Sequence, residues 1–303
     1  MPKLAKYLLF TFAASWLLMA IGVRDYENAG TAGIMTFSYS LSAYMLMPTI
    51  GALIAGADFR KLGWKPVFGK GARYLLIAWL APTVFAVLGA VVYYTAFPND
   101  FATAGNFVRD IDRDKYIQCQ ESGGSYTWYV IRELFSSFTS FFIIPSAVLG
   151  LGEEIGWRGF MFPELRERFG RTKGVILGGA IHGAWHFPLM LLAGYEYGRD
   201  YIGAPHLGLF AFTIFCITTG TISNWLYEKT RCIWLCGLFH GAVNSSFDPC
   251  ILRADGHYER SVFGPMDIGL VAGIPYMIAA FVVLYMQHKH DEADFAGLGE
   301  MDS

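Results

Sequence analysis

The stretch LGEEIGWRGFMF, residues 151–162, places two adjacent glutamates and an arginine inside an otherwise apolar run. Read as a helix, it sets Glu154 and Arg158 four residues apart on one face, where the guanidinium can neutralise the carboxylate. Glu153 points about 100° away around the same helix. The stretch therefore predicts a helix that carries a paired carboxylate and a second carboxylate available for another task.

The composition around this stretch is that of an integral membrane protein. The 303 residues are 54% hydrophobic and only 16% charged, and the mean hydropathy is +0.38, values that exceed those of soluble domains in apolar content. The net charge of −2 provides no basic surface for nucleic acid. We expect an all-α polytopic membrane protein without a nucleic-acid partner.

The apolar segments predict about eight transmembrane helices, since a bilayer core needs about 20 apolar residues per helix. The expected spans are 4–23, 34–56, 74–97, 136–163, 174–194, 206–227, 231–248 and 268–287. They form a single membrane domain over residues 1–303, with a motif-bearing core at about 136–248 and an acidic tail at 288–303.

The lysines and arginines predict the orientation of these spans. Most of them fall on one side if the N-terminus lies inside, so we expect both termini in the cytoplasm. The first span is expected to be a retained signal anchor. The default location is the cytoplasmic membrane of a prokaryote, or the endoplasmic reticulum in a eukaryote. Cys119 and Cys250 fall in two loops on the same expected side, where a disulfide between them is one option.

Two further spans carry polar side chains at a depth that matches Glu153. His182 and His186 share one face of a helix, and His240 and Asn244 share one face of another. At 1.5 Å per residue, Glu153, His186 and Asn244 each lie roughly 20 Å from the inner end of their span. Ionisable groups within a membrane are usually functional or paired. We therefore expect the three spans to meet at one buried polar site.

Two carboxylates, an arginine, imidazoles and an amide suit the hydrolysis of a peptide bond. A buried carboxylate can take a proton from water and pass it to a leaving amine, and an imidazole can hold the same water. A second imidazole and an amide can donate hydrogen bonds to the oxyanion that develops. Histidine and glutamate are also zinc ligands, so metal-assisted hydrolysis would use the same residues.

Three motifs resemble, in order and approximate spacing, those of the CPBP intramembrane proteases. This family is named for CAAX prenyl endopeptidases and bacteriocin-processing enzymes, and is also called the abortive-infection family. The motifs are Glu153-Glu154-x-x-x-Arg158, HGAWHFPL at residues 182–189 and LFHGAVNSS at residues 238–246. The family pattern has an aromatic residue four positions before the histidine of the second motif. This chain has His182 there, so the motif histidine corresponds to His186.

The resemblance implies a role for each of four residues. Glu153 with His186 would activate the attacking water, and His240 with Asn244 would stabilise the tetrahedral oxyanion. In a metal-dependent version, zinc would be held by Glu153, His186 and His240. We favour the glutamate mechanism, which needs no cofactor, over the zinc mechanism.

The resemblance gives Glu154 and Arg158 supporting roles, and it leaves the role of His182 open. Glu154 would assist catalysis or be held by Arg158. His182 is interpreted as a polar spacer or a secondary donor that binds substrate.

The expected function is that of an endopeptidase that cuts a membrane-associated, prenylated or leader-type peptide, in a cavity reached from the cytoplasmic side. Its partners would be a peptide or lipidated protein substrate and membrane lipids. Two other classes use similar residues: a proton-coupled transporter with a relay of titratable groups, and an inert relative that acts as an immunity or chaperone-like partner. The clustering of the titratable groups at one level favours the peptidase.

Overall fold

The fold was analysed in a computed structural model that describes residues 1–28, 30–65, 67, 69–121, 125–139, 143–254 and 259–299. Within these ranges every element of regular secondary structure is a helix. The only β pairing among the described residues is an isolated bridge between Phe101 and Arg253. The expected all-α fold is thus confirmed.

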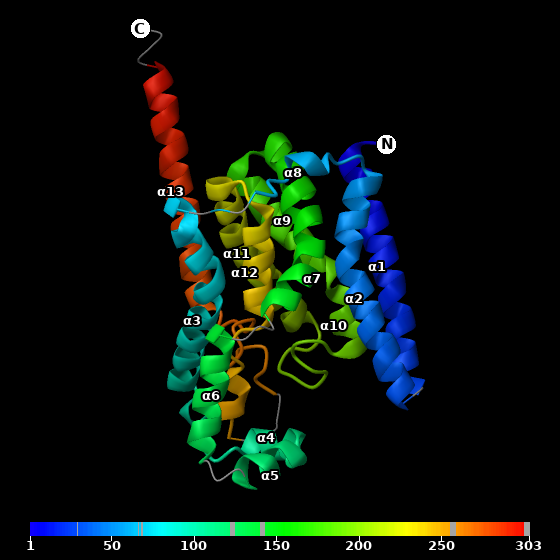
Figure 1. Cartoon of the computed structure of the whole chain (residues 1–303), viewed down its shortest axis with the longest axis vertical. Coiled ribbons are helices and arrows are strands. Elements are labelled where there is room, and N and C mark those ends of the chain that lie inside the picture. Colours follow the sequence, from blue (N-terminus) through cyan, green and yellow to red (C-terminus); the bar gives the residue numbers. More distant parts are fainter. Residues whose placement is uncertain are drawn as a thin grey trace.

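Thirteen α-helices follow one another along the described part of the chain (Figure 1). The long ones are α1 (Lys3–Asn28), α2 (Gly30–Ile54), α3 (Ala72–Ala96), α11 (His206–Thr230) and α13 (Ile274–Gly299). The shorter ones are α4 (Asn106–Ile111), α5 (Arg113–Glu121), α6 (Tyr126–Thr139), α7 (Ile143–Gly156), α8 (Phe162–Phe169), α9 (Arg171–Trp185), α10 (Phe187–Ala193) and α12 (Ile233–Asn244). A π-helical turn, η4 (Trp157–Met161), joins α7 to α8, and four 3₁₀ turns complete the set: η1 (Phe59–Lys61), η2 (Gly69–Gly71), η3 (Pro98–Asp100) and η5 (Pro249–Leu252).

Five helical segments of the described chain are long and apolar enough to cross a membrane: Lys3–Arg24, Gly33–Ile54, Ala72–Ala96, Arg171–Ala193 and His206–Thr230. The pair Tyr126–Thr139 and Ile143–Phe169, bent by 54°, would add a sixth if it forms one span. The chain is therefore a multi-pass membrane protein, and the expected count of about eight spans stays a prediction.

The seventh expected span, 231–248, is shorter in the structure than the sequence suggested. It corresponds to α12, which has 12 residues. At 1.5 Å per residue such a helix is roughly 18 Å long, well short of the ~30 Å hydrocarbon core of a bilayer. The eighth expected span becomes α13, which starts at Ile274 and continues through the expected acidic tail as far as Gly299.

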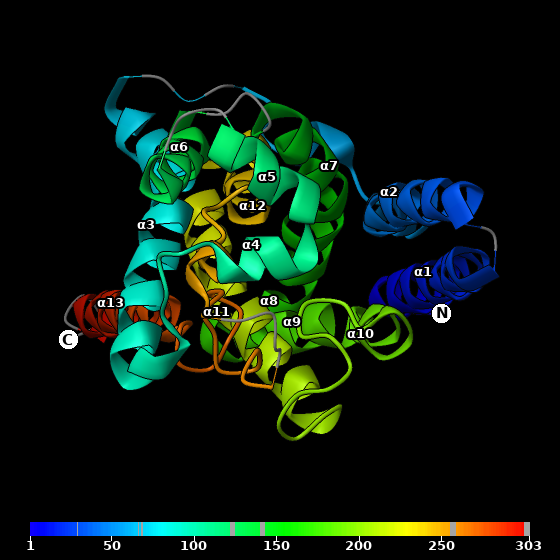
Figure 2. The same ribbon diagram turned by 90° about the horizontal axis from the view of Figure 1, so that it is seen from below.

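The helices that carry the three motifs lie at the centre of the bundle. Figure 2 shows α7, α9, α11 and α12 in the middle, with α1 and α2 on one side and α3 and α13 on the other. Among the contacts, α12 packs against α7, and α9 packs against α11. Figure 1 shows the N-terminus and the C-terminal end of α13 at the same end of the molecule. The sidedness of that end with respect to the cytoplasm stays a prediction.

Two glycines of α7 allow neighbouring helices to approach the motif closely. A Cβ atom at Gly150 would lie 2.9 Å from the ring of His240, and one at Gly152 would lie 2.8 Å from a methyl group of Leu46. Both distances are too short for carbon atoms, so a side chain at either position would displace its neighbour. The first of these contacts brings α12 and its histidine against the helix of the two glutamates.

Helix breaks place His186 and separate the two halves of the second motif. Pro188 has no N–H to continue the ladder of α9, so the α9 helix ends at Trp185 and a new helix starts at Phe187. His186 lies at the break itself. Cys119 lies in α5 and Cys250 in η5, and Cys250 is a free thiol, so the disulfide that the sequence left open is not formed.

Candidate active site

The first motif is built on a helix that changes its winding directly after the two glutamates. Glu153 and Glu154 lie in α7, and Arg158 lies in the π-helical turn that follows. Such turns change the register of a helix and are frequent at functional sites. The three side chains are almost completely buried, with Glu153 3%, Glu154 1% and Arg158 2% exposed.

Glu154 is held by three partners from three helical segments. Nη1 of Arg158 lies 2.8 Å from its Oε1, which confirms the expected ion pair. Nδ1 of His240 lies 2.9 Å from the same oxygen, and the hydroxyl of Ser223 donates to Oε2 at 3.1 Å. Because a buried carboxylate is stable only when it is paired and hydrogen-bonded, these contacts fix Glu154 and orient the His240 ring.

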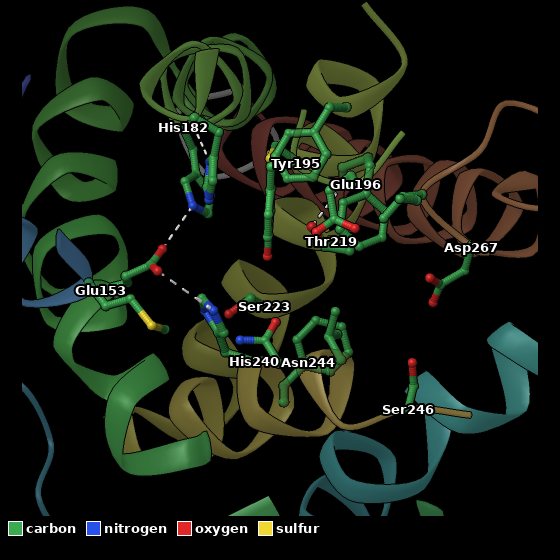
Figure 3. Close-up of a pocket in the computed structure, with 18 of the residues that line it drawn as sticks. Glu153, His182, Tyr195, Glu196, Thr219, Ser223, His240, Asn244, Ser246 and Asp267 are labelled. Atoms are coloured by element: carbon green, nitrogen blue, oxygen red, sulfur yellow. Dashed lines mark hydrogen bonds and ion pairs between the residues drawn. The ribbon is translucent and has the colours of Figure 1, made fainter. Parts of the chain in front are cut away.

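Glu153 lies between the imidazoles of two other helices (Figure 3). Nε2 of His182 is 3.1 Å from its Oε2, and the indole N–H of Trp157 donates to the same oxygen at 3.2 Å. Nε2 of His240 is 3.9 Å from Oε1. This last separation is shorter than twice a hydrogen-bond length of about 2.8 Å, so one water molecule can bond to both atoms.

His182, which the sequence interpreted as a polar spacer or secondary donor, contacts the Glu153 carboxylate directly. The expected role of His186, to activate the water together with Glu153, stays a prediction. Nδ1 of His186 lies 3.1 Å from the carbonyl oxygen of His182. A carbonyl can only accept, so Nδ1 of His186 carries the proton and Nε2 keeps its lone pair.

All seven residues that the sequence singled out line one cavity of about 490 Å³. The expected meeting of the three motif helices is therefore confirmed, while the catalytic roles stay predictions. The seven residues are Glu153, Glu154, Arg158, His182, His186, His240 and Asn244. Asn244, the last residue of α12, is exposed on the cavity wall, whereas Glu153 and Glu154 lie at its buried end.

The cavity also has lining residues that sequence reasoning did not identify. Tyr44 from α2 stacks on Trp185 at 3.8 Å between ring centroids, and its hydroxyl donates to the Trp185 carbonyl at 2.7 Å. Ser223 supports Glu154 from α11. Glu196 and Asp267 enter from two loops. A single tyrosine or serine in an apolar span, or an acid in a loop, has no periodicity that would have marked it.

The loop residues show how the cavity extends along the molecule. Residues 195–196, 246–248 and 266–268 line it, and these loops lie on the side of the site away from both termini (Figure 1). The cavity therefore extends from the buried glutamates toward these loops. The side from which a substrate enters stays a prediction.

A possible metal centre in this cavity differs from the expected one. Among the described residues, the donor atoms of His182, His186 and Cys216 lie within 4.8 Å of one another. Nδ1 of His182 is buried without a hydrogen-bond partner, as a free ligand atom would be. Three protein ligands and one open position suit catalytic zinc, which supplies a Lewis acid when bound. The set shares only His186 with the expected ligands Glu153, His186 and His240.

Comparison with known proteins gives two matches that cover the motif region. Residues 135–246 match a family model described as type II CAAX prenyl endopeptidase Rce1-like. CAAX prenyl protease 2 of Methanococcus maripaludis is 28% identical over 167 residues, which are 54% of this chain and 57% of the relative. The alignment thus spans little more than half the length of that relative. Residues 135–246, which carry the three motifs that meet in one cavity, are therefore similar to the CAAX prenyl endopeptidases that this family model describes.

Proposed function

We propose that this protein is an intramembrane endopeptidase that hydrolyses a peptide bond of a membrane-associated substrate. The observation that carries the proposal is the buried Glu153 carboxylate, which lies between His182 and His240 in a cavity inside the helical bundle. The name of the similar archaeal protein, CAAX prenyl protease 2, points to a prenylated peptide as the substrate class. A leader-type peptide is the alternative substrate.

In the proposed mechanism, Glu153 is the general base. A water held near Oε1 of Glu153 attacks the peptide carbonyl carbon while the carboxylate accepts one proton from the water. Nε2 of His186 carries a lone pair and can hold the second hydrogen of this water. The protonated Glu153 then gives its proton to the leaving amine as the C–N bond breaks, and a carboxylic acid and an amine are released, between which the remaining proton of the water passes to give a carboxylate and an ammonium group.

His240 and Asn244 are proposed to stabilise the oxyanion. With Nδ1 of His240 on Glu154, Nε2 of the protonated ring is the donor that remains for substrate. The amide of Asn244, one helical turn further along α12, lines the same wall of the cavity. Fixed donors of this kind act where charge develops in the transition state, at about 10²–10³-fold in rate per donor.

The direct test is cleavage of defined peptides by the purified full-length protein in liposomes. Farnesylated peptides with a C-terminal CAAX sequence are compared with the same peptides lacking the lipid, and products are identified by mass spectrometry. We expect cleavage of the lipidated peptide that is lost in Glu153→Gln. If neither peptide nor a random peptide library is cleaved, the peptidase proposal is wrong, and proton flux into the same liposomes becomes the next measurement.

A further inference from the structure

The end of the cavity opposite Glu153 is strongly acidic. Asp267, Glu196 and Asp248 line it, and Figure 3 shows Asp267 across the cavity from Glu153. The described lining contains five carboxylates and one guanidinium, that of Arg158. This guanidinium is already paired with Glu154. The three carboxylates at the far end therefore have no cationic counterpart on the cavity wall.

Asp267 is the residue that points most directly to a ligand. It is only 6% exposed, yet its Oδ2 has no hydrogen-bond partner. Burial, followed by the charge of Glu196, raises the pKa of Asp267 to about 7. Native structures rarely leave a buried carboxylate oxygen unsatisfied, because the lost hydration costs free energy. The unpaired oxygen of Asp267 is explained if a bound molecule donates a hydrogen bond to it.

Glu196 is held at the same end of the cavity by an unusual backbone. Its φ angle is +71°, a left-handed conformation that residues other than glycine rarely adopt. Its carboxylate is hydrogen-bonded by the hydroxyl of Tyr195, and burial raises its pKa to about 7, with the nearby charge of Asp248 adding to the shift. Two acids in the same cavity are thus kept in surroundings that favour the arrival of a positive charge.

The spacing of these acids favours an organic cation over a metal ion. Within the described residues, Asp267, Glu196 and Asp248 do not form a group of three donor atoms within 4.8 Å, unlike the His182 group. A small ion needs its oxygen ligands closer together, at about 2.0–2.6 Å from its centre. A guanidinium or an ammonium on a flexible stem can reach acids that are further apart. Phe247, Met266 and Ile268 line the cavity beside the acids and offer an apolar surface for the stem.

We propose that Asp267, Glu196 and Asp248 form a subsite that binds a basic side chain, lysine or arginine, of the peptide substrate. The proposal rests on the proposed peptidase function, because it places this side chain in the same cavity as the scissile bond. It narrows the substrate class to peptides with a basic residue near the cleaved bond.

The first experiment measures the preference for a basic residue directly. A peptide that the protein cleaves is altered one position at a time, with lysine or its neutral analogue norleucine at each place around the scissile bond. We expect one position at which lysine raises kcat/KM by about tenfold over norleucine, the effect of one charge-assisted hydrogen bond. In Asp267→Asn and Glu196→Gln this ratio should fall toward one. The control Asp114→Asn, an exposed acid of α5 outside the cavity, should keep the ratio.

A second experiment separates this proposal from the peptidase proposal. Binding of hexylammonium is measured by thermal stabilisation of the detergent-solubilised protein, with hexanol as the neutral probe and with wild type, Asp267→Asn and Asp114→Asn. Stabilisation by the amine that depends on Asp267 supports the subsite even if no peptide is cleaved. Cleavage without a lysine preference at any position, or equal stabilisation of all three proteins by the amine, would overturn the subsite proposal. The peptidase proposal would then still be tested separately by the loss of cleavage in Glu153→Gln.

Discussion

Nε2 of His182 lies 3.1 Å from Oε2 of Glu153, the proposed general base. His182 occupies the position at which the motif that this sequence resembles has an aromatic residue. An ionised carboxylate only accepts hydrogen bonds, and Nε2 therefore carries the proton. The indole of Trp157 donates to the same oxygen and lies 4.9 Å from the His182 ring. The two donors fix the direction in which the other oxygen of Glu153 faces.

His182→Phe is expected to reduce turnover without unfolding the protein. Phenylalanine keeps the ring contact with Trp157 but removes the hydrogen bond to Glu153, so the carboxylate is less well oriented. We expect kcat to fall by about 10–100-fold with little change in KM, since one charge-assisted hydrogen bond is worth about 1.5–3 kcal/mol. His182→Gln, which restores a donor, should recover part of the loss; unchanged kinetics in His182→Phe would show that His182 is only a spacer.

Glu153→Gln is expected to abolish cleavage while the protein stays folded. Glutamine has the same shape and its carbonyl can still accept from His182 and Trp157, but it cannot take a proton from water. Activity should drop to the background of the assay, with the melting temperature in detergent close to that of wild type. Measurable turnover in a folded Glu153→Gln protein would rule out the general-base assignment.

Arg158→Ala is expected to lower stability together with activity. The substitution leaves Glu154 buried without its ion-pair partner, and breaking one side of such a pair costs about 3–5 kcal/mol. Arg168→Ala is the matched control, because its pair with Glu164 is also four residues apart but has side chains 43% and 24% exposed. Exposed pairs contribute about 1 kcal/mol or less. Equal melting temperatures for the two variants would contradict the structural importance of the Arg158 pair.

The sequence was sufficient for the parts of the site that depend on helix geometry. A spacing of four residues predicted the contact of Glu154 with Arg158, and equal depths predicted that Glu153, His186 and Asn244 line one cavity. These relationships follow from the rise and turn of a helix and need no knowledge of the neighbours.

The remaining features depend on rotation and packing that spacing does not determine. The rotation of α9 and the break before Pro188 decide that His182, and not His186, contacts Glu153. The close approach at Gly150 decides where His240 lies. Glu196 and Asp267 come from loops, whose paths are set by tertiary contacts rather than by a hydrophobic period.

Asp267→Asn is expected to stabilise the protein at high pH. The pKa of Asp267 is raised to about 7 by burial and by Glu196, with a smaller contribution from Asp248. The folded protein therefore keeps a proton that the unfolded chain releases above about pH 4, and the free energy of unfolding falls as pH rises from about 4 to about 7. Asparagine does not titrate and escapes this loss. The difference in melting temperature between Asp267→Asn and wild type should grow between about pH 5 and about pH 8; a difference that is the same at both values would contradict it.

Removal of metal ions is expected to leave peptide cleavage intact. Glu153 already contacts His182, and His240 already contacts Glu154, so the proposed base and oxyanion donor are positioned by protein groups alone. The alternative is a zinc ion held by His182, His186 and Cys216, the donors that lie within 4.8 Å of one another.

Elemental analysis of the purified protein distinguishes these mechanisms when it is run beside cleavage with and without a chelator. Cys216→Ser is the informative variant, because serine removes a soft zinc ligand while Glu153 and its partners keep their contacts. Chelator-resistant cleavage by metal-free wild type, retained in Cys216→Ser and lost in Glu153→Gln, is the result that the glutamate mechanism requires. The opposite result is stoichiometric zinc in wild type, with both the zinc and the cleavage lost in Cys216→Ser. It would assign the catalytic centre to His182, His186 and Cys216, and Glu153 would then be the acid that orients His182.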